Sequence, residues 1–459
     1  MNGKSGGNLL GTAAVGLAAL LLSACGDEEA ASDFLDQNEP ATEQQQDSGS
    51  QGSTSEDSTS GDSTSGDSTS GDSTSGDSTS GGSTSGDSAG GTSDEETAAI
   101  DCGTSPCVGP DHPYSSVQAA VDAAPDGGSV GIQDGSYRQC FVIPEHKSLT
   151  IKALDGRPHI KSRLCDGDKG VLVNYSKGEV VVDGLELSDA GTDKVIWHHD
   201  NTGALILRNV EVHNAGMGIL ASTNSERLEI HDSEFYDMDE PTQNGHLVYA
   251  GQVKDLVIKG SYFHSARNGH MIKAKSVNVD IENNYLLDNY GTTANLINIW
   301  GCGTNRVVGN AIVSENRDGA VQAMDVTVRK RYGDVKPCPV NNADITIAYN
   351  SFLKKGETLW SSLLLDVYDM DSMTIENNLV TGARLVKDGT TQGVYWYPGD
   401  WNGKNQSYAA DQYLDDQLHV ESAPSAVDSA HEPTEQYRHP MATEPRDNAY
   451  NMGAYSISQ

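Results

Sequence analysis

A six-residue motif recurs seven times between Leu207 and Val380. Each copy starts with an aliphatic residue and ends with an apolar one; the copies are Leu207–Val212, Ile230–Phe235, Ile258–Phe263, Ile281–Leu286, Val307–Ile312, Ile347–Phe352 and Ile375–Val380. They begin 23, 28, 23, 26, 40 and 28 residues apart, a period typical of solenoids, whose turns bury apolar side chains against their neighbours. The spacing predicts a coil of three short strands per turn, with an additional loop at 330–342. The fixed leucine-asparagine pattern of leucine-rich repeats is absent.

Stacked turns place equivalent residues in rows along the solenoid, about 4.8 Å apart. The fourth position of the motif is asparagine in four copies, at Asn284, Asn310, Asn350 and Asn378. Their amides can bond to one another from turn to turn. We therefore predict a structural asparagine ladder here rather than a functional site.

The two ends of this region resemble a known family. Ser115–Ala124 has the pattern of a short amphipathic helix with a serine N-cap, and a glycine-rich turn and a strand follow within 125–137. This order resembles the opening of pectate-lyase-like β-helices, in which the helix covers the open core. The segments 422–428 and 452–455 are similar to the endings of secreted bacterial β-helix proteins. The resemblance spans residues 108–459 and implies an all-β, right-handed parallel β-helix with a short N-terminal capping helix.

The N-terminus predicts export. An apolar run from Leu9 to Leu22 follows Lys4 and is too short for a membrane span, so we interpret it as the core of a signal peptide. The sequence Leu22-Ser-Ala-Cys25 resembles the bacterial lipobox, which implies that Cys25 is lipidated; an ordinary cleavage beside Ala24 is the alternative. Gly26 follows the cysteine, where aspartate would signal retention in the inner membrane. The resemblance therefore implies delivery to the outer membrane or cell surface.

An acidic segment follows the signal peptide. Residues 26–100 hold 18 acidic side chains and no Lys or Arg, and Gly-Asp-Ser-Thr-Ser repeats fill 61–80. Such a composition cannot bury enough apolar surface to offset its ordering entropy. We predict a signal peptide at 1–24, a lipidated cysteine and disordered tether at 25–100, and a β-helix domain at 101–459.

The charge restricts the partners. The chain has a net charge of −36, and residues 101–459 alone carry 29 basic and 48 acidic side chains. This balance argues against a nucleic-acid partner, and an acidic substrate would need a local basic cluster. No stalk of a homotrimer is evident, so we expect a monomer that meets the membrane only through its lipid.

Six cysteines remain after Cys25, and an exported protein is expected to pair them. Cys102 and Cys107 could close a short loop, whereas Cys140 and Cys165 lie one solenoid turn apart. Cys302 and Cys338 could close the base of the additional loop. No Cys-x-x-Cys pair exists, so we predict no metal site.

A second repeat indicates where chemistry could occur. Gly-His followed by two apolar residues occurs at Gly245–Val248 and again, 24 residues later, at Gly269–Ile272; a weaker copy begins at Asn295. Alignment stacks His246, His270 and Asn295 in one row. The same alignment stacks Tyr249, Lys273 and Asn298 in a second row. Counting about ten residues back from Ile375, the start of the last motif copy, adds Asp366 to this row. Strand alternation turns the side chains of this row outward. Arg267 and Lys275 flank these rows as a local basic patch.

The repeat resembles one in a group of bacterial β-helix proteins that have Gly-His, two apolar residues and then Lys-Ser-Arg. Gly269, His270 and Lys273 match this pattern, but Ala274 and Lys275 stand in place of Ser and Arg. The resemblance implies a shared site and names no reaction.

These residue types suit β-elimination on a uronate polysaccharide. One group must neutralise the C6 carboxylate, a base must take the C5 proton, and an acid must protonate the leaving oxygen. The candidates are Lys273 or Tyr249 as the base and His270 or His246 as the acid. Those for carboxylate binding are Arg267, Lys275 and Asn298.

Three alternatives stay open. A hydrolase needs two carboxylates about 5–10 Å apart, for which Asp325, Asp366 and Asp369 are available. Calcium-dependent lyase chemistry needs an outward acidic cluster; Asp237, Asp239 and Glu240 form only a weak one, and we predict no cofactor. A non-catalytic glycan-binding or adhesion protein could instead display the aromatic and imidazole rings of Trp197, His198, His199, Trp396, Tyr397 and Trp401.

Overall fold

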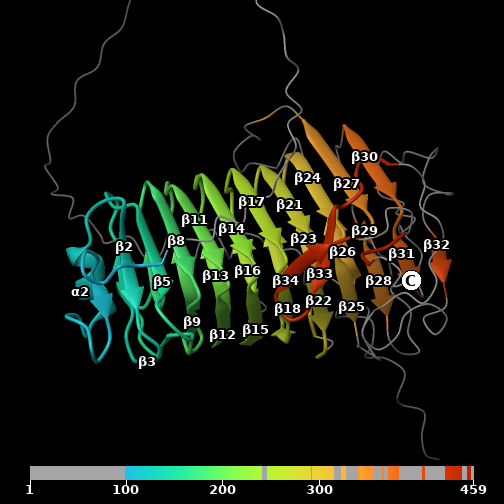
Figure 1. Cartoon of the computed structure of the whole chain (residues 1–459). Coiled ribbons are helices and arrows are strands. Elements are labelled where there is room, and N and C mark those ends of the chain that lie inside the picture. The colour runs from blue at the N-terminus through green and yellow to red at the C-terminus, as the bar shows by residue number, and fades with distance from the viewer. Residues whose placement is uncertain are drawn as a thin grey trace, which may run out of the picture. The chain divides into compact units, whose positions relative to one another are not determined.

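Parallel β-strands make up nearly all regular structure in the described part of the chain. The computed structural model describes residues 99–239, 245–290, 292–314, 322–326, 340, 342–354, 364–365, 371–381, 406–408, 429–446 and 452–455. Within them, the strands form three long parallel sheets (Figure 1).

The first sheet has 11 strands within the described ranges. In spatial order they are β1 (Cys107–Val108), β2 (Gly128–Ile132), β5 (Leu149–Ala153), β8 (Glu179–Asp183), β11 (Ala204–Arg208), β14 (Arg227–His231), β17 (Asp255–Lys259), β21 (Asn278–Glu282), β24 (Gly303–Val308), β27 (Ala343–Ala348) and β30 (Ser372–Glu376).

The second sheet has 12 described strands. They are β3 (Ser136–Tyr137), β6 (His159–Lys161), β9 (Glu186–Ser188), β12 (Glu211–Ala215), β15 (Glu234–Asp239), β18 (Tyr262–His264), β22 (Tyr285–Asp288), β25 (Ala311–Ser314), β28 (Ser351–Lys354), β31 (Leu379–Thr381) and β32 (Gln406–Tyr408), with β19 (Ala266–Arg267) paired to β15.

The third sheet has nine described strands. They are β4 (Phe141–Ile143), β7 (Leu172–Asn174), β10 (Lys194–His198), β13 (Met217–Ala221), β16 (Val248–Ala250), β20 (Ile272–Ala274), β23 (Asn295–Ile299), β26 (Gln322–Val326) and β29 (Leu364–Leu365).

Each turn of the chain contributes one strand to each sheet in the same order. The strands β8, β9 and β10 form one such turn, and the next turn pairs with it in parallel register. Inward side chains alternate with outward ones, as in β17, where Leu256 and Ile258 are buried. The inward rows form one continuous apolar core. The predicted right-handed parallel β-helix is confirmed.

The asparagine ladder is also confirmed. Asn284 Nδ2 donates to Asn310 Oδ1 at 2.9 Å, Asn310 to Asn350 at 3.0 Å, and Asn350 to Asn378 at 3.0 Å. All four side chains are fully buried. The same row continues toward the N-terminus as Ser261, whose backbone N–H donates to Asn284 Oδ1 at 2.9 Å.

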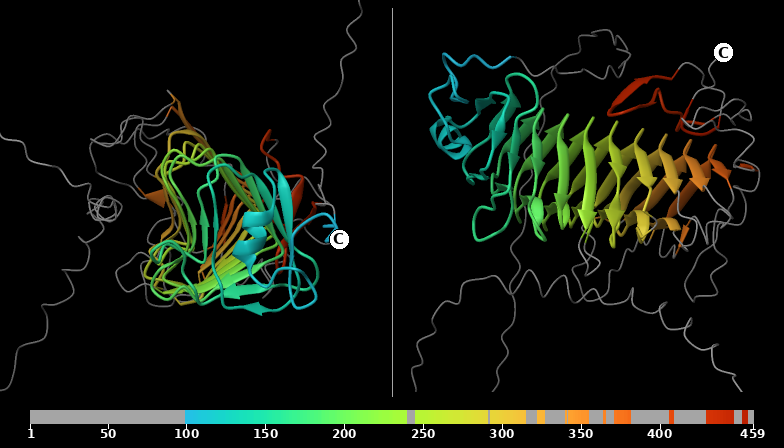
Figure 2. Two further views of the ribbon diagram at one scale, coloured as in Figure 1. Left: turned by 90° about the vertical axis from the view of Figure 1, so that its left-hand side faces the viewer. Right: turned by 90° about the horizontal axis from the view of Figure 1, so that it is seen from below.

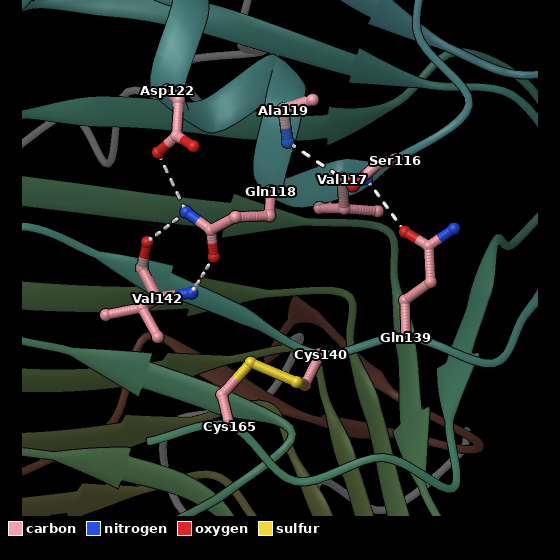
Figure 3. Close-up of a disulfide and its surroundings, with 9 residues drawn as sticks. All are labelled: Ser116, Val117, Gln118, Ala119, Asp122, Gln139, Cys140, Val142 and Cys165. Atoms are coloured by element: carbon pink, nitrogen blue, oxygen red, sulfur yellow. Dashed lines mark hydrogen bonds between the residues drawn. A yellow bond between two sulfur atoms is a disulfide. The ribbon is translucent and has the colours of Figure 1, made fainter.

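A short helix covers the N-terminal end of the core. This helix, α2 (Val117–Ala123), begins after the N-cap Ser116, one residue later than the predicted cap, and buries its apolar side on β1, β2 and β4. The left view of Figure 2 looks along the solenoid and shows this helix in front of the stacked strands. Gln118 exchanges two hydrogen bonds with the backbone of Val142, at 3.1 and 2.7 Å, beside the Cys140–Cys165 disulfide (Figure 3).

Two of the predicted disulfides are present. Cys102 pairs with Cys107, and Cys140 pairs with Cys165 across one turn, as the spacing predicted. Cys302 is also disulfide-bonded. Its predicted partner, Cys338, lies outside the described residues.

The chain returns along the 12-stranded sheet near its C-terminus. An antiparallel hairpin, β33 (Glu435–Arg438) and β34 (Ala442–Pro445), lies against β18 and β22 (Figure 1, red). Lys259 Nζ holds Glu435 at 2.7 Å, and the Tyr437 ring lies 5.7 Å from the Tyr285 ring. No helix in the described part of the chain has the length and apolarity to cross a bilayer.

Candidate functional site on the nine-stranded sheet

The predicted outward row lies on four neighbouring strands of the nine-stranded sheet. The register pairs Tyr249 with Lys273, Lys273 with Asn298, and Asn298 with Asp325, on β16, β20, β23 and β26. The residues on either side, such as Ile272 and Ala274, are buried in the core. The predicted stacking of Tyr249, Lys273 and Asn298 is therefore confirmed.

The assignment of Asp366 to this row is wrong. The register pairs Asp325 with Leu365, so Leu365 occupies that position. The count from the following motif was off by one residue because turn lengths vary along the solenoid. Asp366 itself lies outside the described residues, and so does Asp369.

Two lysines and two aromatic rings form the centre of the site. Lys273 Nζ lies 5.1 Å from the centroid of the Tyr249 ring and 5.9 Å from that of Trp300. Lys275 Nζ lies 5.7 and 5.6 Å from the same two centroids. These distances are within the range of cation–π attraction. Two ammonium groups are thus concentrated between two rings on the outer face.

Trp300 was not among the predicted site residues. It follows β23, and its backbone N–H donates to Ala274 O at 2.7 Å, just as that of Lys275 donates to Ala250 O at 2.7 Å. Trp300 therefore stacks on Lys275. The signal was present in the sequence, because Trp300 lies two residues after Asn298 and strand alternation turns both outward.

Asn298 supplies an amide at the edge of this cluster. Its Nδ2 donates to Asp325 Oδ2 at 2.9 Å, and its Oδ1 is buried without a hydrogen-bond partner among the described residues. Asp325 thus fixes the orientation of the amide. The buried oxygen is an acceptor that a ligand hydroxyl could satisfy.

The histidine row forms as predicted, but it is more buried than a proton-donating pair would be. The rings of His246 and His270 stack with centroids 5.2 Å apart, and His246 Nδ1 accepts the backbone N–H of His270 at 2.8 Å. Burial lowers the pKa of His246 well below its usual value. Burial and the Lys273 ammonium lower the pKa of His270 to about 3.

Both imidazoles are therefore neutral near neutral pH. A neutral imidazole cannot act as the acid that protonates a leaving oxygen, so neither ring fits the role that the sequence analysis gave it. His246, which is 3% exposed and bonded to the backbone, positions the strand that carries Lys273.

Arg267 is committed to other partners. It lies on β19 in the 12-stranded sheet, where its Nη1 contacts Asp239 Oδ2 at 3.1 Å and its guanidinium lies 4.1 Å from the Tyr290 ring centroid. The Tyr290 and Asp239 contacts raise the pKa of Arg267. Lys275 is thus better placed than Arg267 to bind a carboxylate near Lys273.

The same face carries further cations toward the N-terminus. Lys169 Nζ and Lys194 Nζ lie 4.8 and 4.9 Å from the Trp197 ring centroid. Trp197 occupies the same row as Tyr249, two turns earlier, because β10 pairs with β13 and β13 pairs with β16. Lys169 also pairs with Asp166 at 3.0 Å. No sequence motif marked these two lysines, so the basic face is longer than predicted.

The aromatic display expected of a glycan-binding protein is only partly present. Trp197 is 8% exposed, and its Nε1 donates to Ser222 Oγ at 2.9 Å. His198 is fully buried, so its predicted surface position is wrong: it occupies an inward row of β10. His199 is half-buried and contacts the Tyr175 and Trp197 rings. Trp396, Tyr397 and Trp401 lie outside the described residues.

The buried His198 should make the free energy of unfolding depend on pH. Burial lowers its pKa to about 4, and Asn174 and Thr202 contact its ring nitrogens at 3.1 Å. Below a pH of about 6.5 the unfolded chain takes up a proton at this side chain, whereas the folded chain does not until about pH 4. From about pH 7 to about pH 5, this histidine should lower the free energy of unfolding by about 2 kcal/mol.

The measurement is urea unfolding of wild type and His198→Asn across this pH range. The wild type should lose about 2 kcal/mol more than the variant. Parallel pH profiles would show that His198 is protonated in the folded protein.

Two residues of the weak acidic cluster considered for calcium, Asp237 and Asp239, lie in the described part of the chain. Asp239 is paired with Arg267, which neutralises its charge. Asp237 has a left-handed backbone, with φ of 53°, in β15. Glu240 lies outside the described residues.

Comparisons with known proteins place this region in a family. The model of the right handed beta helix region matches residues 169–325 and 218–400, which together span just over half of the chain. No curated protein sequence matches. Among solved structures, pectate lyase Pel9A is similar over 76% of this chain and 92% of that one, at 14% identity and a TM-score of 0.45.

A pectin methylesterase from Aspergillus niger, in deglycosylated form, is similar over 48% of this chain and 83% of its own, at 10% identity and a TM-score of 0.35. The family match includes β10 to β29 and therefore the whole row from Tyr249 to Asp325.

Proposed function

The chain belongs to the right-handed β-helix family, and from this premise we propose that it is a surface-anchored, carbohydrate-active protein that cleaves a uronate-containing polysaccharide by β-elimination. The observation that carries the proposal is the cluster of Lys273 and Lys275 between the Tyr249 and Trp300 rings. It concentrates positive charge on the outer face of a strongly acidic chain. Such a face can hold a polyanion locally although the whole molecule repels it.

We assign carboxylate binding, proton abstraction and protonation of the leaving oxygen to different residues of the cluster. The Lys275 ammonium binds the C6 carboxylate, which makes the C5 proton more acidic. Asn298 Oδ1 accepts a hydrogen bond from a sugar hydroxyl. Lys273 acts in its neutral amine form, takes the C5 proton through Nζ and becomes an ammonium. The electrons form the C4–C5 double bond, the C4–O bond breaks, and the Tyr249 hydroxyl donates its proton to the leaving oxygen. Trp300 offers a flat apolar surface to a sugar ring.

Attachment to the cell completes the proposal. Cleavage before Cys25 and its lipidation would leave the acidic segment 25–100 as a tether for the β-helix domain at 101–459. The Cys102–Cys107 and Cys140–Cys165 disulfides support an oxidising compartment. We expect an exported, lipid-anchored monomer.

The test is a panel of uronate polymers incubated with purified protein. β-Elimination should release products with the ultraviolet absorbance of an unsaturated uronate. New reducing ends without this absorbance would favour the hydrolase. Saturable binding by isothermal titration without any product would favour the non-catalytic protein, and either outcome would overturn the lyase assignment.

A further inference from the structure

A histidine–glutamate–histidine cluster lies on the 12-stranded sheet, away from the strands that carry Lys273. We propose that His159, Glu186 and His213 bind a Zn²⁺-type transition-metal dication. The three residues come from β6, β9 and β12, which are consecutive neighbours in the sheet. This site is independent of the proposed lyase activity.

The donor atoms converge on one carboxylate oxygen. His159 Nδ1 lies 3.1 Å from Glu186 Oε1, and His213 Nε2 lies 2.9 Å from the same oxygen. All three donor atoms lie within 4.8 Å of one another. Tetrahedral zinc with bonds of about 2.1 Å separates its donors by about 3.4 Å. Each imidazole nitrogen already lies within hydrogen-bond distance of Glu186 Oε1, so side-chain rotation would bring the three donors to the spacing that one ion requires.

The rings are held in position by neighbouring side chains. His159 Nε2 lies 2.6 Å from Ser188 Oγ, so the nitrogen that does not face Glu186 has its own partner. The His213 ring stacks on Tyr236 with centroids 4.6 Å apart and planes 7° apart. Such contacts orient ligand imidazoles in metal sites and increase metal affinity.

Charge around the cluster is compatible with a dication. Glu186 supplies the one carboxylate ligand, while the adjacent Glu211 in the same row is neutralised by Arg157 at 3.0 Å. Lys161 lies near His159 and opposes a cation. Two imidazoles and a carboxylate nevertheless suit zinc, whose sites with three protein ligands leave a fourth position for water or a ligand. The three side chains are 15–23% exposed, so that position faces solvent.

Other histidine–glutamate contacts in the described residues involve single pairs. His264 Nε2 contacts Glu234 Oε1 at 2.9 Å, and His231 Nε2 contacts Glu229 Oε2 at 2.9 Å. His264 also stacks on the other side of Tyr236, with centroids 5.0 Å apart. It thus shares the environment of His213 but belongs to a two-residue pair. His264→Ala is therefore the matched control.

The experiment titrates Zn²⁺ into the full-length chain, purified without an affinity tag and freed of metal with a chelator. Calorimetry should show one saturable site. Co²⁺ added in place of Zn²⁺ should give visible absorption bands from the same site. His213→Ala and Glu186→Gln should each weaken binding by about 100-fold or more, whereas His264→Ala should leave the affinity unchanged.

Three outcomes would overturn the proposal: no saturable binding to the wild type, wild-type affinity in Glu186→Gln, or an equal loss in His264→Ala. Glu186→Gln keeps the shape and hydrogen-bonding ability of the side chain, so it tests the site even if His213→Ala fails to fold. Circular dichroism of each variant identifies folded samples.

Discussion

Replacing Lys273 with alanine should lower kcat/KM for release of unsaturated product by about 10²–10⁴-fold, the range typical of a lost general base. Most of the loss should fall on kcat, because the Lys275 ammonium stays between the Tyr249 and Trp300 rings to bind the carboxylate. The fold should persist, since Lys273 is on the outer side of β20 while Ile272 and Ala274 fill the core. The measurement is initial rate on the polymer that the wild type cleaves.

The matched control is Lys254→Ala. Lys254 lies just before the 11-stranded sheet's β17, is 63% exposed and pairs with Glu226 at 3.3 Å. Its loss removes the same charge from the chain without touching the proposed site, so the rate should not change. Small primary amines should partly restore Lys273→Ala, because they can replace the missing base. Wild-type rates in Lys273→Ala, or an equal loss in Lys254→Ala, would contradict the proposed role of Lys273.

The fold was predictable because the same six-residue pattern of buried and turn positions recurs in successive turns. The first position of every motif copy is buried, and so is the last position of the first six copies. The asparagine row gave the register of the four turns that share it. The third motif position carried a signal that the sequence analysis did not use. All seven residues at this position have positive φ. Six of them are Asn209, Asp232, Gly260, Asn283, Gly309 and Asn377, and Tyr349 is the seventh. Glycine, asparagine and aspartate tolerate this conformation best.

The site was only partly predictable, because its chemistry depends on contacts between turns. Strand alternation was enough to align Tyr249, Lys273 and Asn298. It could not show that His246 and His270 are desolvated and neutral, since that depends on side chains from neighbouring turns. Nor could it show that Arg267 is held by Asp239 and Tyr290. Loops of unequal length also shifted the count that led to Asp366.

Substitution of Asn310 by alanine should lower the free energy of unfolding by about 3–5 kcal/mol, because it leaves several buried polar groups unpaired. Asn310 Nδ2 donates to Asn350 Oδ1 at 3.0 Å, to Ile281 O at 2.8 Å and to Val308 O at 3.1 Å. Its Oδ1 accepts from both the backbone N–H and the side-chain amide of Asn284, each at 2.9 Å. No water can replace these bonds in a fully buried row without opening the turn.

Two further variants separate the ladder from a general effect of losing an amide. Asn278→Ala removes a half-buried amide that bonds to Asp255 at 2.8 Å, and it should cost less than about 1 kcal/mol. Asn310→Ser should fall between the other two. Serine already occupies this row at Ser261, where its Oγ accepts the Ser233 N–H at 3.2 Å, but it cannot also reach a second turn as the asparagine amide does. Urea unfolding gives all three values, and equal costs for Asn310→Ala and Asn278→Ala would show that the amides do not act as a connected ladder.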